Sequence, residues 1–438
     1  MKLLRRRAAP ATPPGSAERL AVAAAAEPHP PSAQTTRPLA ALLVADAISL
    51  TGNAMGFVAI PWFVLETTGS ASLTGAVAAL KFAPTVLAAF FGGAIVDRLG
   101  FRRTSILADV ASGVTVAAIP LLHATVGIEL WQLFMLVFLG ALFDAPGATA
   151  RRSLLPDLVE LSGTRLERAT GINGAIQRGS LLVGAPIAGL LVAWIGATNV
   201  MWVDAVTFTV SAALIARAVP RVPPHAPAAE PEGRFADLTA GLRFIARDPL
   251  IRTVVITVLI TNFLDAPFPV VFPVFALEAF GSAVHLGAML GVFGGFALLG
   301  SLAFGAFGHR FSRRRTFVFS FLLAAVPYLL LALLPPLPVT LVLMAVWGLA
   351  AGPLNPVLAT VAYERIPAHM RGRVLGATVA GAYLAIPAGA LLGGIVVDAF
   401  GVAATLAGIG VCYLAVTTAG VFNPVFRAMD PEPEAAAA

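Results

Sequence analysis

The sequence predicts an all-α integral membrane protein with twelve transmembrane helices in two six-helix repeats. Hydrophobic residues make up 58% of the chain and charged residues only 12%, against about 25% charged residues in soluble domains. Apolar stretches long enough to cross a bilayer alternate with short polar loops. A basic loop motif occurs twice, about half a chain apart, as expected for two copies of one membrane unit.

Twelve apolar segments follow one another along the chain. A helix needs about 20 apolar residues to cross the core of a bilayer. The candidate spans are residues 39–65, 71–96, 104–122, 129–149, 170–194, 199–217, 250–275, 286–308, 317–334, 340–361, 374–399 and 402–423.

The positive charges indicate how the spans are oriented. Lys81 and Arg178 lie inside spans, and the other basic residues lie in the tails or in and beside the loops after spans 2, 4, 6, 8 and 10. The loops after the odd-numbered spans contain none. Loops rich in Lys and Arg stay in the cytoplasm. We therefore expect a multi-pass protein with both termini cytoplasmic, and we attribute the isoelectric point of 10.2 to this topology and not to nucleic-acid binding.

The polar segments divide the chain into five parts. Prolines interrupt the sequence after Arg5, Arg6 and Arg7, so it lacks the apolar core of a signal peptide. Residues 234–247 have helical apolar spacing and are expected to lie along the membrane surface. The expected parts are a disordered cytoplasmic tail (1–37), an N-terminal six-helix bundle (38–217), a cytoplasmic linker with the surface helix (218–249), a C-terminal six-helix bundle (250–424) and a second cytoplasmic tail (425–438).

Glycine is concentrated in spans that correspond between the two repeats. Span 5 matches span 11, through the stretches that begin at Gly184 and Gly389, and span 2 matches span 8, through those that begin at Gly93 and Gly305. Small residues let helix backbones approach closely in a membrane. Static packing is one explanation, and the matched placement favours another, a sliding seam between the halves formed by spans 2, 5, 8 and 11.

The loop after span 2 carries the most specific motif. It reads Gly93-x-x-x-Asp97-Arg98-x-Gly100-x-Arg102-Arg103, and a degraded copy follows span 8, with His309 and Arg310 in place of Asp97 and Arg98. This motif resembles the signature of the major facilitator superfamily, over roughly residues 39–424. Short stretches around Pro156 and Arg371 resemble the bacterial exporters of macrolides and of enterobactin.

This resemblance implies transport by alternating access, from a site between the two halves in a bacterial inner membrane. In the family the aspartate that matches Asp97 lies at the interface of the halves. It pairs with a basic residue of the motif and with an acid at the end of helix 4. Arg102 and Asp144 are the residues expected in these two roles, because Phe101 occupies the usual basic position. The other residues expected to take part in gating are Gly93, Arg98, Gly100 and Arg310.

Span 5 also resembles the antiporter motif of the family's exporters, through Pro186 and Gly189. We therefore expect a proton-coupled antiporter that exports small amphipathic molecules, such as drugs or siderophores. The alternatives are a metabolite facilitator or importer, and a membrane scaffold or sensor that transports nothing.

Charged side chains inside the spans are candidates for coupling and binding, because an ionisable group there costs several kcal/mol and faces a cavity or a partner. Asp265 lies about 15 residues into span 7, beside three prolines expected to break the helix. A carboxyl group at that depth is the best candidate for proton coupling. The alternative is a structural Asp bonded to Asn262 or to a neighbouring helix.

Other polar groups in the spans are expected to line the central cavity or to form pairs. They are Asp46, Asn53, Lys81 and Arg178. Asp46 is shallow and is expected to reach cytoplasmic water, and Lys81 is expected to pair with Asp46 or Asp265 or to meet an anionic substrate. Asp109 and Asp204 are taken as local helix caps.

The sequence contains no phosphate-binding loop, no nucleophile elbow and no ligand-like histidine pair on one helix face. We therefore expect no enzyme activity, no metal and no cofactor. The expected partners are a small-molecule substrate, protons and the lipid bilayer, with the protein as a monomer.

Overall fold

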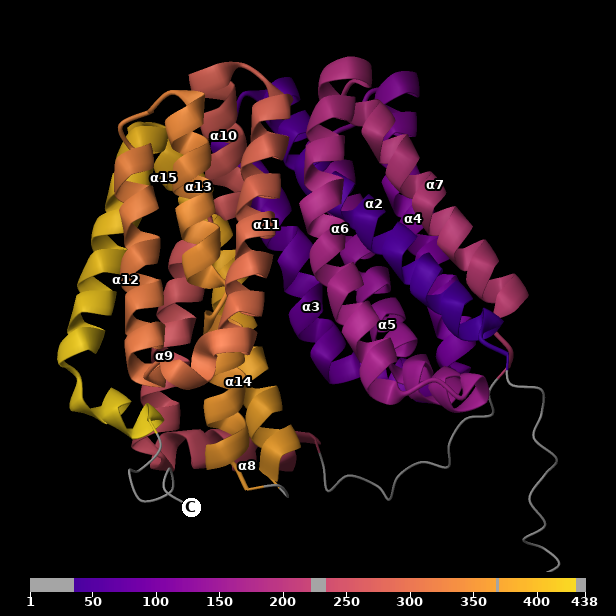
Figure 1. The fold of residues 1–438 in the computed structure, drawn as a ribbon. Helices are drawn as coiled ribbons and strands as arrows, with labels where there is room; N and C mark the ends of the chain where they lie inside the picture. Colours follow the sequence, from indigo (N-terminus) through magenta and orange to yellow (C-terminus); the bar gives the residue numbers. More distant parts are fainter. Residues whose placement is uncertain (1–34, 222–233, 368–369, 431–438) are drawn as a thin grey trace, which may run out of the picture.

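The computed structural model describes residues 35–221, 234–367 and 370–430, without the side chains of 85–98, 234–238, 372, 379, 380 and 382. Figure 1 shows two helical bundles side by side, an N-terminal half in indigo and magenta and a C-terminal half in orange and yellow. We call the side on which helix α2 (Arg37–Thr68) begins and helix α15 (Arg371–Phe422) ends the tail side, and the opposite side the far side. The expected disorder of residues 1–34 and 431–438 lies outside the described residues.

The described part of the N-terminal half contains six long helices. They are α2 (Arg37–Thr68), α3 (Ala71–Leu99), α4 (Phe101–Thr125), α5 (Leu130–Ser162), α6 (Leu166–Ile195) and α7 (Ala197–Ala218).

The described part of the C-terminal half contains more helices than the N-terminal half, because two of its spans are each broken into two helices. They are α9 (Pro249–Asp265), α10 (Phe268–Phe280), α11 (Ala283–Phe307), α12 (Arg313–Leu331), α13 (Leu337–Ala351), α14 (Leu354–Arg365) and α15 (Arg371–Phe422). Gly401 interrupts α15 with φ 80° and ψ 165°, so α15 is two consecutive spans without a loop between them.

The twelve-helix fold is confirmed. Ten segments of the described chain are long and apolar enough to cross a membrane, and one of these is the double helix α15. Helix α3 supplies the remaining span. Pro267 breaks span 7 as the sequence predicts, whereas the break of span 10 at Gly352 and Pro353 was not predicted. Residues 150–162, expected in a loop, continue α5 instead.

Helix α8 (Arg234–Arg247) lies across the tail-side ends of the C-terminal half (Figure 1). The apolar spacing of 234–247 predicts a helix here, and its position along the membrane surface stays a prediction. Gly241 faces the backbone of Arg373 on α15, and Ile245 is buried beside Ile251 and Val374. The apolar face of α8 therefore packs on protein. Residues 424–429 form the short helix η3, whose Phe426 is buried, so the second tail starts later than expected.

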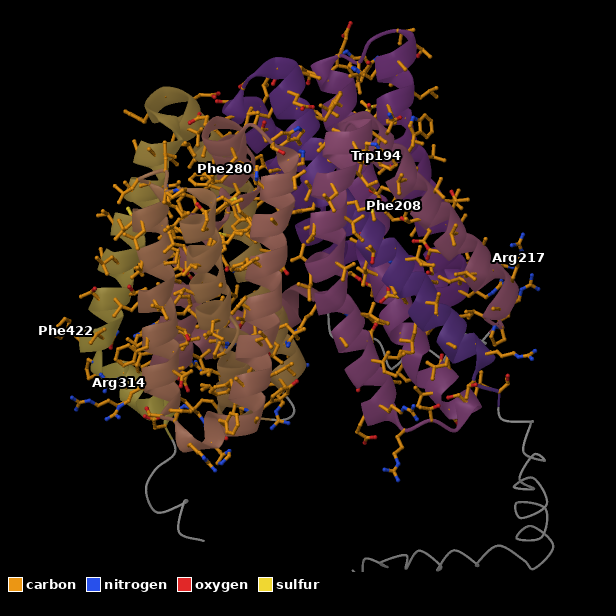
Figure 2. The ribbon with its side chains drawn as sticks, turned by 45° about the horizontal axis from the view of Figure 1, so that its top comes forward. Trp194, Phe208, Arg217, Phe280, Arg314 and Phe422 are labelled. Carbon is orange, nitrogen blue, oxygen red and sulfur yellow. The ribbon has the colours of Figure 1, made fainter. Side chains whose placement is uncertain are left out.

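Each half is tied on its tail side by an arginine at the start of its third span. The Arg102 guanidinium donates to the carbonyls of Ala216 and Val219 at the end of α7. Arg314, the matching residue of the second repeat, donates to the carbonyl of Val421 at the end of α15, at 2.9 Å. Carbonyls at a helix C-terminus lack helical partners, and cations there are favourable. Figure 2 shows Arg314 and Arg217 extending from the tail-side ends of α12 and α7, and Trp194 and Phe280 toward the far side.

Candidate functional site

On the far side the two halves meet through glycines, first along α6 and α11. A side-chain carbon built on Gly189 would lie 2.5 Å from the carbonyl oxygen of Ala283 and 3.0 Å from the Cα of Gly287. Gly291 faces the ring of Pro186 one turn further on. Only glycine permits backbones this close, so the Pro186–Gly189 stretch that resembles an antiporter motif lies in the interface itself.

Helices α3 and α15 make the matching contact on the other side of the interface. A side-chain carbon on Gly75 would lie 2.6 Å from the carbonyl oxygen of Ala390 and 3.2 Å from the Cα of Gly394. Spans 2, 5, 8 and 11 therefore form the predicted glycine seam between the halves. The sliding of this seam stays a prediction.

Toward the tail side the seam ends. The Arg178 guanidinium on α6 donates to the Ser301 hydroxyl on α11 at 2.7 Å. One turn beyond these residues, side-chain carbons on Gly174 and Gly305 would meet nothing within 4 Å. The ribbons of the two halves diverge in the same direction (Figure 1). Arg178 thus bridges the halves where they separate, and it is not among the residues that line the cavity described below.

A buried charge cluster lies inside the N-terminal half. Arg151 on α5 is 3% exposed, and its guanidinium lies 2.9 Å from the Asp46 carboxylate of α2 and 2.7 Å from that of Asp109 on α4. Asp109 also accepts a hydrogen bond from Ser211 on α7, and Asp144 lies 3.9 Å from Arg151. One expectation is wrong here, because Asp109 is a buried partner well inside α4 and not a helix cap. Asp46 pairs with Arg151 and its side chain is 12% exposed, so its contact with cytoplasmic water stays a prediction.

A cavity of about 460 Å³ lies next to this cluster. Its polar lining contains Asn53, Lys81, Asp144, Arg152 and Asp204, among other groups. Its apolar lining includes Phe82 and Phe208 from the N-terminal half and Tyr383 from α15 of the C-terminal half. The mixture of charged groups and aromatic rings suits small molecules that have both polar and apolar parts.

Lys81 and Asp204 both line this cavity, and their opposite charges attract each other. Among the described residues, neither side chain has an ion-pair partner within 4 Å. The Lys81 ammonium lies over the Phe57 ring, 5.7 Å from its centroid, within the range of a cation–π contact. The Asp204 carboxylate is buried where side-chain carbons on Gly52 and Gly56 of α2 would otherwise be. Asp204 is therefore a cavity residue and not the helix cap expected from the sequence. Lys81 pairs with neither Asp46 nor Asp265.

Asn53 and Asp144 connect the cavity with the charge cluster. The Asn53 side-chain amide donates to the Asp144 carboxylate at 3.3 Å, and the Asp144 side chain is 31% exposed. Asp144 was expected in the gating relay, whereas its described contacts are with Asn53 and Arg151.

Asp265 lies in a separate place, inside the C-terminal half. It is the last residue of α9, and its carboxylate accepts hydrogen bonds from the hydroxyls of Tyr328 (2.8 Å) on α12 and Tyr413 (3.3 Å) on α15. Trp347 packs on Tyr328, with ring centroids 4.7 Å apart. Asp265 does not line the cavity, and its contacts match the structural alternative of a bond to neighbouring helices. Its role in proton coupling stays a prediction.

The loop motif after α3 is only partly described. The side chains of Gly93, Asp97 and Arg98 lie outside the described residues. Gly100 has φ 79° at the start of α4, a left-handed value that favours glycine. Arg102 binds the end of α7, as above, so its guanidinium is not directed to Asp144. Arg310 lies in the 3₁₀ turn η1 (Gly308–Arg310), with its guanidinium over the Phe307 ring at 6.0 Å.

Three charged residues of the site were missed or misjudged because the ends of the spans were placed too short. Arg151 was counted in a loop, but it follows Asp144 by two helical turns in an apolar stretch that continues through Leu154, Leu155 and Leu158. This continuation is the signal that could have revealed it. Asp109 and Asp204 are followed by further apolar helix, but nothing in their own sequence identifies their partners.

Comparisons with known proteins agree with this architecture. The model of the Major Facilitator Superfamily matches residues 42–298 and 254–437. The multidrug efflux pump Tap of Mycolicibacterium fortuitum is 35% identical over 400 residues, which cover 90% of this chain and 97% of that protein. The macrolide efflux protein A of Streptococcus pyogenes is 23% identical over 363 residues, 82% of this chain and 88% of that protein.

Solved structures show the same fold at low sequence identity. The nucleoside transporter NupG superposes with a TM-score of 0.73 at 11% identity, over 89% of this chain and 98% of that one. A D-xylose–proton symporter gives a TM-score of 0.67 at 15% identity, over 89% and 98% of the two chains. The exporter subgroup predicted from the short stretches is confirmed by the Tap and macrolide efflux relatives. The chain belongs to the Major Facilitator Superfamily, and it is a membrane transporter and not an enzyme.

Proposed function

We propose that the protein exports small amphipathic molecules, of the kind carried by drug-efflux pumps, by proton-coupled antiport across a bacterial inner membrane. The observation that carries this proposal is the cavity of the N-terminal half, where charged groups and aromatic rings face a common space beside the interface of the halves. The names of the relatives, a multidrug and a macrolide efflux pump, support the direction and the substrate class.

The conformation supports alternating access with both termini cytoplasmic. The glycine seam holds the halves together on the far side, and beyond Arg178 and Ser301 they separate toward the tail side. The positive-inside rule assigns the tail side to the cytoplasm. The protein is then in an inward-facing state, in which the cavity can take up substrate from the cytoplasm. In this proposal it works as a monomer.

Proton coupling is supported by the charge balance around the cavity. Around the cavity and the charge cluster lie four carboxylates, on Asp46, Asp109, Asp144 and Asp204, and three cations, on Arg151, Lys81 and the exposed Arg152. Arg151 already contacts Asp46 and Asp109. Uncompensated charge in a membrane is expensive, so Asp144 and Asp204 are the groups that take up a proton or a cationic substrate. Lys81 offsets the charge of only one of them while the cavity is empty.

The test is transport in inside-out vesicles with an acidified lumen, with ethidium and the macrolide erythromycin as probes. We expect accumulation that collapses when the pH gradient is removed. Asp204→Asn is expected to reduce gradient-driven accumulation to the level of empty vesicles, because it removes the group that exchanges the proton. Glu160→Gln, an exposed carboxylate on α5, serves as the matched control and retains transport.

The same vesicles separate the alternatives. Flux that follows only the probe gradient would indicate a facilitator, and no flux of any probe would favour a scaffold or sensor. Asp265→Asn is the second arm. Loss of coupling in Asp265→Asn together with normal coupling in Asp204→Asn would move the proton site to the C-terminal half and contradict this proposal.

A further inference from the structure

Asp398 joins the two halves on the far side by an unusual contact. It lies on α15, three residues before the break at Gly401, and its carboxylate reaches the beginning of α3 in the other half. It accepts hydrogen bonds from the Ala71 and Ser72 backbone N–H groups, both at 2.8 Å, and from the Ser70 hydroxyl at 2.9 Å.

These N–H groups belong to the first turn of α3, which leaves them without partners inside the helix. A helix commonly caps such groups with its own preceding side chain, and a carboxylate is favourable there because of the helix dipole. In α3 the Ser70 hydroxyl caps only the Leu73 N–H, at 3.2 Å. The capping of Ala71 and Ser72 depends on Asp398, and therefore on contact between the halves.

The contact lies where the backbones are closest. A side-chain carbon on Gly394, one turn before Asp398, would lie 3.0 Å from the Cα of Ser72. The hydrogen bonds of Asp398 therefore hold the tightest part of the α3–α15 seam. These helices cannot separate on the far side without breaking all three hydrogen bonds.

The other seam lacks such a carboxylate. In the repeat, Asp398 corresponds to Ala193 on α6, as Gly394 corresponds to Gly189. Helix α11 is capped by its own Ser282, whose hydroxyl accepts from the Val284 N–H at 3.2 Å. The two seams therefore share their glycine packing, but among the described residues only the α3–α15 seam has a carboxylate that joins the halves on the far side, because the charged contact of the α6–α11 seam, from Arg178 to Ser301, lies at its tail-side end.

We propose that Asp398 is a positioning residue that keeps the far side of the transporter closed while the cavity faces the tail side, and that it releases α3 when the far side opens. This inference rests on the alternating access proposed above. Asp398 is exposed and Ser70 and Ser72 are partly exposed, so water can replace their hydrogen bonds after separation. The contact is thus strong enough to bias the closed state and weak enough to break in each cycle.

The test reads the seam directly in purified protein, without transport or a proton gradient. Ala390, which is fully buried beside Gly75, is replaced by Cys in a Cys412→Ser background, and its rate of maleimide labelling reports separation of the halves. Asp398→Asn is expected to raise this rate by about 2- to 30-fold, the range that corresponds to loss of a helix cap. Asp398→Glu keeps the charge and is expected to restore most of the protection.

The matched control is Glu66→Gln, which neutralises an exposed carboxylate near the same end of the molecule, and it should leave the rate unchanged. A second reporter, Ala325→Cys, lies in the core of the C-terminal half and should stay protected in every variant. Equal rates for Asp398→Asn and Glu66→Gln would overturn the proposal. So would an equal rise at Ala325, because Asp398 would then stabilise the bundle and not the seam. Failure of proton-driven transport with a positive result here would overturn only the coupling proposal.

Discussion

At the scale of single residues, the protein holds its buried charges by bringing them together from separate helices. Arg151 of α5 lies between Asp46 of α2 and Asp109 of α4, and Ser211 of α7 supports Asp109. Helices α2, α4 and α5 therefore meet at one guanidinium, and α7 joins them through Asp109. Removing one partner of a buried ion pair leaves an uncompensated charge, which is far more costly than removing the pair as a whole.

Arg151→Ala is therefore expected to destabilise the protein by about 3–5 kcal/mol, because it strands two carboxylates in the N-terminal half. The measurement is the thermal unfolding midpoint in detergent. The adjacent Arg152→Ala is the control, since Arg152 is exposed, and its midpoint should change little. Similar midpoints for the two variants would contradict the central role of Arg151.

The types of these residues could be read from the sequence, but their partners could not. Asp46, Asn53 and Lys81 were recognised as polar groups in an apolar region, and Asp144 only through the family resemblance, in the gating relay; all four lie in the cluster or the cavity. The partnership of Asp109 and Arg151 depends on contact between α4 and α5, to which the local pattern of either helix gives no guide. The same holds for Tyr328 and Tyr413, whose hydroxyls reach Asp265 from two other helices.

At the scale of elements, the glycines have two different roles along one helix. On α6, Gly189 lies against the backbone of α11, whereas Gly174 has open space around its Cα. In a membrane the close approach of backbones supplies the van der Waals contact that holds helices together. The composition of span 5 predicted a glycine-lined face, but only the packing distinguishes glycines that contact another helix from those that do not.

Substitution by alanine should change the unfolding midpoint in opposite directions for these two kinds of glycine. Alanine favours a helix by up to about 1 kcal/mol over glycine, so Gly174→Ala is expected to raise the unfolding midpoint. At Gly189 the added carbon overlaps the Ala283 carbonyl, and overpacking costs about 1–3 kcal/mol, so Gly189→Ala is expected to lower it. A higher midpoint in both variants would show that the α6–α11 contact is not close.

At the scale of the whole molecule, the two repeats form halves that touch on the far side and diverge on the tail side (Figure 1). The twelve spans and the twofold repeat could be predicted, because hydropathy, loop charge and motif spacing all report on topology. The sequence could not reveal which side of the interface is closed, because the same sequence must form both states of the transport cycle. The extended α5 and the broken span 10 also escaped prediction, although the apolar residues after Arg151 and the proline at position 353 are local signals that could have revealed them.

The orientation of the whole molecule can be tested with reporter fusions. An alkaline phosphatase fused after residue 127, in the loop that follows α4, should be active because that loop is expected outside the cell. A fusion after residue 164, beyond α5, should be inactive, whereas a fluorescent protein at the same position should fluoresce. The reverse pattern would invert the topology and with it the proposed direction of transport.

The arginine ties on the tail side have a mechanical consequence. Arg102 and Arg314 each bind the third span of a half to the last turn of its sixth span, through backbone carbonyls that do not depend on side-chain identity. Each half is thereby braced at the end that lies farthest from the glycine seam. We therefore expect each half to move as a rigid body, so that closure at one end of a half is coupled to movement at its other end.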